Sequence, residues 1–170
     1  MPYLNNIIEA LLRLLAEYRV NCVIVGGVAA ALHGSSFLTN DLDVCYARDS
    51  SNLKHLAEAL QSVNARLRNA PAGLPFILDA ETLQRGLNFT FSTDIGHLDL
   101  LGEIRGVGVY EDVLEGSLIF DLFGHQFAVI DIGKLIVAKR AAGRSKDLLV
   151  LPELEAIGEV QAMSKRERQD

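Results

Sequence analysis

The sequence predicts an α/β (α+β) fold in which a mixed sheet is flanked by helices. Apolar residues recur at helical spacing near the start, short apolar runs typical of buried strands follow, and later strand-like runs come in pairs. Early helices combined with later hairpins favour a mixed sheet over a purely parallel one. We expect a single domain over residues 1–160, followed by a charged C-terminal tail at 161–170 of which residues 165–170 form a solvated, frayed end.

The first half of the chain favours alternating helices and buried strands. The run NCVIVGG is typical of a strand that ends at Gly26 and Gly27, and the alanines after it favour a helix capped by Gly34. Ser50 or Ser51 marks the start of a later helix. The predicted elements are a helix at 4–18, a strand at 21–27, a helix at 28–33, a strand at 41–47 and a helix at 50–69.

The second half predicts hairpins followed by two helices. The tripeptide DIG separates two strand-like runs, and Gly124 lies at the centre of another such pair. The predicted elements are a turn-rich link at 70–76, a helix at 80–85, strands at 87–93 and 97–103, a helical turn at 110–114, a hairpin over 117–131, and helices at 132–143 and 146–164.

The composition predicts a globular, cytoplasmic protein with no membrane partner. Of the 170 residues, 49% are hydrophobic and 22% charged, and no apolar run approaches the roughly 18 residues of a membrane span. The N-terminal segment shows neither the basic region nor the cleavage site of an export signal. Cys22 and Cys45 lie in apolar runs without CxxC spacing, which favours buried, reduced thiols over a disulfide or a zinc site.

The charge and the histidines exclude two further classes of protein. A net charge of −6 argues against sequence-blind binding to long nucleic acids, because such binding depends on cations that displace phosphate counterions. A small phosphorylated ligand stays compatible with this charge if basic groups lie nearby. The four histidines are scattered without the spacing of metal ligands.

Asp41 and Asp43 lie at the beginning of the predicted strand at 41–47. Alternate residues of a strand face the same side, so both carboxylates share one face, with Cα atoms roughly 7 Å apart. Carboxylates are hard oxygen ligands that suit Mg²⁺ or Mn²⁺. The alternative is that NDLD is an ordinary junction between a loop and a strand, with exposed acids.

A third acid, Asp99, lies within the apolar run HLDLL. Burial of an unpaired carboxylate is costly, so Asp99 needs a cation or a metal beside it. If its strand is a neighbour of the strand at 41–47, three carboxylates converge across a spacing of about 4.8 Å. A pair of metal ions would then relieve their mutual repulsion.

The glycine pair follows the first predicted strand and precedes a helix. The backbone amides of Gly27 and Val28 can therefore approach a phosphate, although any tight strand-to-helix turn also favours glycine. A dinucleotide-binding site is a further alternative, since Asp43 follows Gly26 by 17 residues. The GxGxxG motif that such a site requires is absent.

Basic residues gather at the end of the helix predicted at 132–143. Lys139 shares a helical face with apolar residues, so its ammonium group is expected at the edge of the core, within reach of a phosphate or an aspartate. We include Lys139 and Arg144 among the expected nucleotide-binding residues. The alternative is that these cations only offset the helix dipole, which we favour for Arg140. Asp147 is expected to pair with one of them.

Together these motifs resemble the nucleotidyltransferase superfamily related to DNA polymerase β, in particular its minimal bacterial and abortive-infection toxin-type members. The shared pattern is a hydrophobic strand, a glycine pair, a short helix, Asp-x-Asp on the next strand and a third acid later. Here it reads IVGG at 24–27, thirteen intervening residues, DLD at 41–43, and Asp99. The segments ALHG, LTNDLDV and LIVAKRAAGRSKD also look like the minimal members, so the resemblance covers about residues 4–158.

The resemblance implies transfer of a nucleoside monophosphate from a nucleoside triphosphate, expected to be ATP, to an acceptor hydroxyl with release of pyrophosphate. Asp41 and Asp43 would hold the metal that carries the triphosphate, and Asp99 would complete the site for a second metal and help deprotonate the acceptor. Gly26 and Gly27 would cradle the outer phosphates.

Two positions depart from the family pattern. Val28 follows the glycines where relatives often carry a phosphate-binding serine, so Ser35, Ser36 or Thr39 would take over that contact. Phe37 stands where many relatives carry an arginine.

The acceptor is left open by the resemblance: RNA, a protein or a small molecule all fit it. The expected single domain is too short to include the second domain that usually positions an acceptor, so we expect a protein partner or a homo-oligomer to do so. The alternative function is a non-catalytic binding module that keeps the fold and acts through a protein partner, as in a toxin–antitoxin pair.

Overall fold

The computed structural model describes residues 5–71 and 73–167, so Leu4 of the predicted first helix, residue 72 of the predicted link and residues 168–170 of the predicted tail lie outside it. The strands are β1 (Cys22–Val25), β2 (Asp41–Tyr46), β3 (Arg66–Leu67), β4 (Asn88–Thr93), β5 (Gly96–Leu101), β6 (Glu103–Ile104), β7 (Gly108–Val109), β8 (Leu118–Leu122) and β9 (His125–Val129). The helices are α1 (Asn6–Glu17), α2 (Gly26–His33), α3 (Ser50–Ser62), α4 (Ala80–Arg85), α5 (Tyr110–Leu114), α6 (Ile132–Ala142) and α7 (Ser145–Glu167).

A mixed sheet forms the centre of the fold. Its strand order is β3-β4-β5-β2-β1-β9-β8, and β6 and β7 form a separate two-stranded sheet. β2 runs parallel to β5 and β1 runs parallel to β9, whereas the other pairs of the large sheet are antiparallel. The predicted mixed sheet is therefore confirmed, and β2 lies at its middle.

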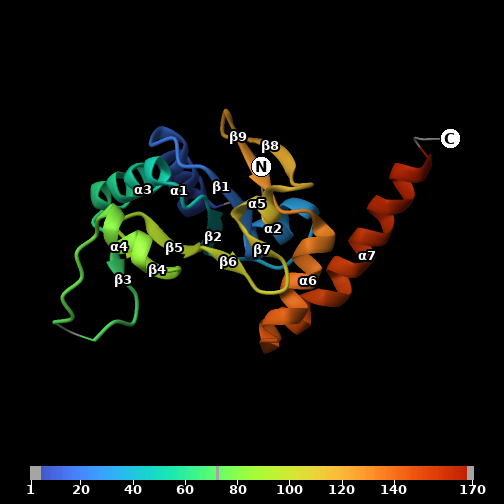
Figure 1. The fold of residues 1–170 in the computed structure, drawn as a ribbon. Coiled ribbons are helices and arrows are strands. Elements are labelled where there is room, and N and C mark those ends of the chain that lie inside the picture. The colour runs from blue at the N-terminus through green and yellow to red at the C-terminus, as the bar shows by residue number, and fades with distance from the viewer. Residues whose placement is uncertain (1–4, 72, 168–170) are drawn as a thin grey trace.

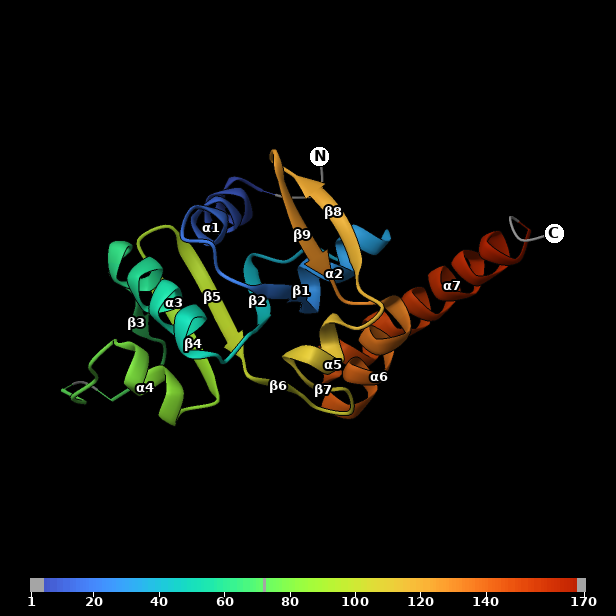
Figure 2. The same ribbon diagram turned by 45° about the horizontal axis from the view of Figure 1, so that its top comes forward.

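The helices form two groups around this sheet (Figures 1 and 2). α1 and α3 lie side by side near β2 and β5, while α6 and α7 pack together beside α2 at the other end. α7 extends away from the sheet in both views. Among the described residues, no helix combines the length and the apolar character needed to cross a membrane.

One face of the central strands is apolar. Leu42, Val44, Leu98 and Leu100 are fully buried, and they belong to one cluster with the leucines of α1 and α3. Because successive side chains of a strand alternate between faces, this burial directs the residues between them to the opposite face. Asp43 and Asp99 are among those residues, so packing of the core decides which way the acids point.

The predicted hairpins are confirmed. β4 and β5 pair antiparallel across a short connection, and so do β8 and β9. Phe123 and Gly124 connect β8 to β9 with φ angles of +56° and +81°. Positive φ at both central residues is typical of the tight turns that match the twist of paired strands.

Two helix boundaries differ from the prediction. The helix predicted over 50–69 is wrong beyond Ser62, because Asn64 adopts φ +51° and the chain then enters β3. The last helix is longer than predicted, since α7 runs through Pro152 to Glu167. Residues 165–167, the described part of the segment expected to be frayed, are therefore helical.

The two cysteines are buried thiols that form no disulfide with each other, as the sequence predicts. Cys22 and Cys45 are both buried and free. Burial raises the pKa of each thiol to about 12. Both therefore remain protonated and act as small apolar residues of the core.

Asn52 of α3 provides a test of the packing. Its buried amide bonds to the backbone of Asn21 in both directions, accepting at 2.7 Å and donating at 3.0 Å, and donates to the carbonyl of Ala47 at 2.7 Å. We expect Asn52→Ala to lower the free energy of unfolding by about 2–4 kcal/mol, because buried backbone groups lose their partners. Urea unfolding measures this loss. Ser51→Ala, one residue earlier and exposed, is the control, and equal losses in both variants would contradict the prediction.

Candidate active site

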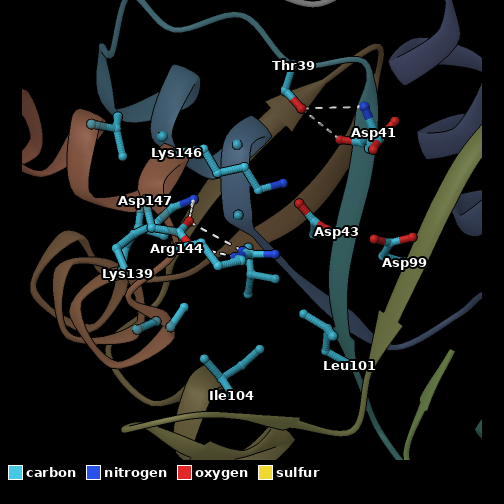
Figure 3. Close-up of a pocket in the computed structure, with 18 of the residues that line it drawn as sticks. Thr39, Asp41, Asp43, Asp99, Leu101, Ile104, Lys139, Arg144, Lys146 and Asp147 are labelled. Carbon is cyan, nitrogen blue, oxygen red and sulfur yellow. Dashed lines mark hydrogen bonds and ion pairs between the residues drawn. The ribbon is translucent and has the colours of Figure 1, made fainter. Parts of the chain in front are cut away.

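A cavity of about 510 Å³ lies where β1 meets α2 and β2 begins. Figure 3 shows acidic side chains from β2 and β5 along one side, and basic side chains from α6 and the start of α7 along the other. The cavity thus gathers most of the residues selected from the sequence. Those that line it are Gly26, Gly27, Thr39, Asp41, Asp43, Asp99, Lys139 and Arg144.

Ser35 and Ser36 are placed differently from the expectation. The Ser35 hydroxyl donates to Glu153 Oε2 at 2.6 Å, and the backbone amide of Ser36 donates to Oε1 at 2.8 Å. Both serines therefore hold the end of α2 against α7, and neither lines the cavity. Thr39 does line it, with its hydroxyl donating to the backbone carbonyl of Asp41 at 3.2 Å.

The aspartates converge because their strands are neighbours. The parallel register of β2 and β5 sets Asp43 directly beside Asp99, and Asp41 beside His97. Neighbouring residues in register point to the same face of a sheet. The expected pairing of these two strands is therefore confirmed, and it sets Asp43 and Asp99 side by side, with Asp41 two residues away on the same face.

Burial and mutual repulsion raise the proton affinity of this cluster. The pKa of Asp43 rises to about 6, mainly because the carboxyl is desolvated and then because Asp99 repels it, while nearby lysines and the Gly27 amide oppose the shift. Burial also raises the pKa of Asp99, against the opposing charge of Arg68. Asp43 and Asp99 are therefore harder to ionise than exposed aspartates, and a cation beside them would favour their charged forms.

The glycine pair supports the acids directly. Gly26 adopts φ +65°, and a Cβ atom on it would lie 2.1 Å from Asp43 Oδ2. A Cβ on Gly27 would lie 2.8 Å from the Cβ of Thr39, and the Gly27 backbone amide lowers the pKa of Asp43. The pair thus makes room for Asp43 and Thr39, so its conformation serves the acid cluster.

Arg68 is the site residue that sequence reasoning missed. Its Nη2 lies 2.6 Å from Asp99 Oδ1 and its Nη1 lies 3.3 Å from Asp41 Oδ2. We missed it because residues 50–69 were predicted to form one helix, and a helix does not direct residue 68 toward the strands that carry the acids. The available signal was the alternation of Ala65, Arg66, Leu67 and Arg68 after a turn-forming asparagine, which is typical of a short strand.

The opposite wall is held by Asp147, which is fully buried. Asp147 accepts from Lys139 Nζ at 2.9 Å and from Arg144 Nε at 2.6 Å, so the predicted pairing is confirmed and involves two cations. Burial raises the pKa of Asp147, but its hydrogen bonds with Arg144 and Lys139 outweigh this effect and hold the pKa below its usual value. Lys146 extends across the cavity toward Asp43 in Figure 3, whereas Arg140 pairs outside the cavity with Glu155.

The chemistry of the acid cluster fits a divalent cation. Three carboxylates supply hard oxygen ligands, and a cation beside Asp43 would offset both the burial of this carboxyl and its repulsion by Asp99. As the side chains stand, no three Asp, Glu, His or Cys residues within 5–71 and 73–167 are gathered closely enough to hold a metal ion. Asp41 and Asp99 hold Arg68 instead, so a cation could join all three acids only after Arg68 moves.

No family model matches the chain, and a search of curated proteins finds no match. Among solved structures it resembles the lincosamide antibiotic adenylyltransferase LnuA in its lincomycin-bound form, with a TM-score of 0.60 and 12% identity over 91% of this chain and 98% of that one. It also resembles the antibiotic-resistance factor ANT(2'')-Ia, including its complex with adenylyl-2''-tobramycin, with a TM-score of 0.55 and 14% identity over 96% of this chain and 97% of that one. The chain therefore has the fold of the nucleotidyltransferases.

A comparison of Gly26 with Gly143 distinguishes two costs of adding a Cβ atom: backbone strain and the close contact with Asp43. Both have a left-handed backbone, with φ +65° and +62°, but a Cβ at position 143 meets only ordinary van der Waals contact. We expect Gly143→Ala to cost about 1–2 kcal/mol of stability, and Gly26→Ala to cost roughly 2 kcal/mol more because it displaces Asp43. Urea unfolding of both variants measures the difference, and equal losses would show that Asp43 adjusts freely.

The raised pKa of Asp43 predicts a pH-dependent stability. A folded pKa of about 6, above the usual 3.8, means that the contribution of this group is complete at low pH and is lost as the pH rises through about 6. We expect Asp43→Asn to raise the free energy of unfolding by about 1–2 kcal/mol at neutral pH without divalent ions, and to leave it unchanged near pH 4. Urea titrations across this range, with the exposed Asp121→Asn as control, measure the effect. A constant difference at all pH values would refute the assignment.

Proposed function

We propose that the protein is a nucleotidyltransferase that moves a nucleoside monophosphate from a nucleoside triphosphate to an acceptor hydroxyl, with release of pyrophosphate. The observation that carries the proposal is the cavity itself. In it, three aspartates face cations that are held in place by the buried Asp147. The three aspartates are Asp41, Asp43 and Asp99. Phosphoryl transfer requires carboxylates that bind metal and, across from them, cations that bind phosphate. The cavity provides both. The fold, shared with two antibiotic-modifying enzymes, supports the same assignment.

Asp41, Asp43 and Asp99 are the residues that would hold Mg²⁺ or Mn²⁺. When bound, such an ion would neutralise phosphate oxygens and stabilise the charge that develops on the leaving group. The contribution of the chain itself is to hold the carboxylates in register on two paired strands.

The triphosphate would lie against Arg144 and Lys146. Arg144 donates to Asp147 through Nε and Nη2, yet its side chain is 62% exposed, so its Nη1 can bind phosphate oxygens. Lys139 is only 13% exposed and serves mainly to neutralise Asp147. The Gly27 backbone amide lies close enough to Asp43 to lower the pKa of that carboxyl, so we expect side chains, more than the glycine backbone, to bind the phosphates.

The reaction would proceed by attack of the acceptor oxygen on the α-phosphorus. A bond forms between these two atoms, and the bond from the α-phosphorus to the oxygen that bridges to the β-phosphate breaks. Pyrophosphate leaves with that electron pair, and the proton of the hydroxyl passes to Asp99. Because burial raises the pKa of Asp99, its carboxylate is a stronger base than an exposed one.

ATP is the proposed donor, and a small hydroxylated molecule is the proposed acceptor. The structurally similar LnuA is an adenylyltransferase that is bound to lincomycin. The remaining wall of the cavity carries Leu101, Ile104 and Leu135, which offers apolar contact to an acceptor. The volume of about 510 Å³ lies within the range of about 300–1,000 Å³ that is typical of small-molecule sites.

A second candidate is a non-catalytic module that keeps this fold and binds a protein partner. The ion pairs of Arg68 favour it, because Asp41 and Asp99 already have a cation of the chain itself as their partner. Nucleotide binding distinguishes the two candidates, since only the enzyme requires it.

Calorimetry with ATP and Mg²⁺ tests the proposal. We expect the wild-type protein to bind Mg-ATP with a Kd in the micromolar to millimolar range that is typical of enzyme substrates, and Asp43→Asn to weaken binding at least tenfold. Asp121→Asn, on the exposed side of β8, is the control and should bind as the wild type does. Absence of binding in the wild type would favour the non-catalytic candidate.

A further inference from the structure

A row of residues in register crosses four strands on the face of the acids. Asp43 lies beside Asp99, Asp99 lies beside Thr90 of β4, and the backbone amide of Arg68 donates to the Thr90 carbonyl at 2.8 Å. Residues in register point to the same face of a sheet. Arg68 therefore extends its side chain across β4 toward the acids, because the register of β3 places it there.

The Arg68 guanidinium bridges the cluster. Nη2 donates to Asp99 Oδ1 at 2.6 Å, and Nη1 contacts both Asp41 Oδ2 at 3.3 Å and His97 Nδ1 at 2.8 Å. The planar guanidinium group is suited to joining two carboxylates in this way. One cation thus joins carboxylates from two strands, which is also the geometry that a bridging divalent ion would use.

We propose that Arg68 is a resident counter-ion that occupies the acid cluster in the metal-free protein and is displaced when a divalent cation binds. This inference rests on the proposed function, since it assumes that the three aspartates are the metal ligands. Arg68 and the divalent cation compete for the carboxylates of Asp41 and Asp99, and both cannot pair fully with them at once. Apparent metal affinity is then set partly by the fraction of molecules in which Arg68 has left.

Displacement requires movement of the side chain alone. The backbone of Arg68 is fixed by its hydrogen bond to Thr90 and by the pairing of Arg66 and Leu67 with β4. The side chain of Arg68 is 20% exposed, so its outer end reaches solvent and can rotate away.

Arg66 provides a matched control. It precedes Arg68 by two residues and therefore lies on the same face of β3, opposite Ser92. Its side chain is exposed, and among the described residues it forms no ion pair within 4.0 Å. Substitution of either arginine removes one positive charge from this face, but only Arg68 touches the acids.

The experiment compares binding of Mn²⁺ alone to the full chain by calorimetry at neutral pH. The variants are Arg68→Gln, Arg66→Gln, Arg68→Lys and Asp43→Asn. We expect Arg68→Gln to lower the Kd for Mn²⁺ about five- to tenfold, because the competing cation is gone, and Arg66→Gln to change it less than about twofold. Arg68→Lys retains the charge without the planar fork and should fall between them.

Thermal unfolding supplies a second readout. Without divalent ions, Arg68→Gln should melt at a lower temperature than Arg66→Gln, because the acids lose their counter-ion. Saturating Mn²⁺ should raise the Tm of Arg68→Gln more than that of the wild type. These melting curves also show whether each variant is folded.

The outcomes separate this inference from the proposed function. Unchanged or weaker Mn²⁺ binding by Arg68→Gln would overturn the role of Arg68, while loss of binding in Asp43→Asn alone would still support the acids as ligands. If neither the wild type nor any variant binds Mn²⁺, the aspartates are not a metal site and both proposals fail.

Discussion

Repulsion among carboxylates on neighbouring strands is the constraint on which the site depends. Asp43 and Asp99 lie side by side in a parallel pair, with Asp41 two residues away, and partial burial makes their ionisation costly. Such a cluster needs positive charge beside it. The fold supplies that charge from two directions, with Arg68 from β3 and Lys146 from α7. Binding of a metal would change which cation satisfies the acids, while the need for one remains.

The rest of the architecture holds the two walls in place. Leu42, Val44 and the leucines of β5 are buried on one face, which directs the acids to the other. Gly26 lets the start of α2 approach Asp43 without a clashing side chain. Opposite, the buried Asp147 anchors the basic wall through Lys139 and Arg144. An apolar core, a glycine turn and a buried ion pair thus serve one cavity.

Sequence reasoning succeeded where the pattern was local. Strand periodicity placed Asp41, Asp43 and Asp99 on one face, and helical periodicity placed Lys139 at the edge of the core, where its side chain is 13% exposed. It failed where a residue depends on distant partners. Ser35 and Ser36 lie only a few residues before the cavity-lining Thr39 in the sequence. Both nevertheless bind Glu153, which is 118 and 117 residues away in the chain. Periodicity carries no information about such a partner.

The sequence by itself determined the mixed sheet, the hairpins and the alternation that aligns the acids, because these follow from residue spacing and turn chemistry along the chain. Only the tertiary structure decided which strands are neighbours, and therefore that Arg68 reaches Asp99 across β4. Strand order arises from the packing of helices and strands that lie far apart in the chain. A short strand such as β3 carries little local signal, so its pairing with β4, and the cation that it brings to the acids, emerge only when the sheet assembles.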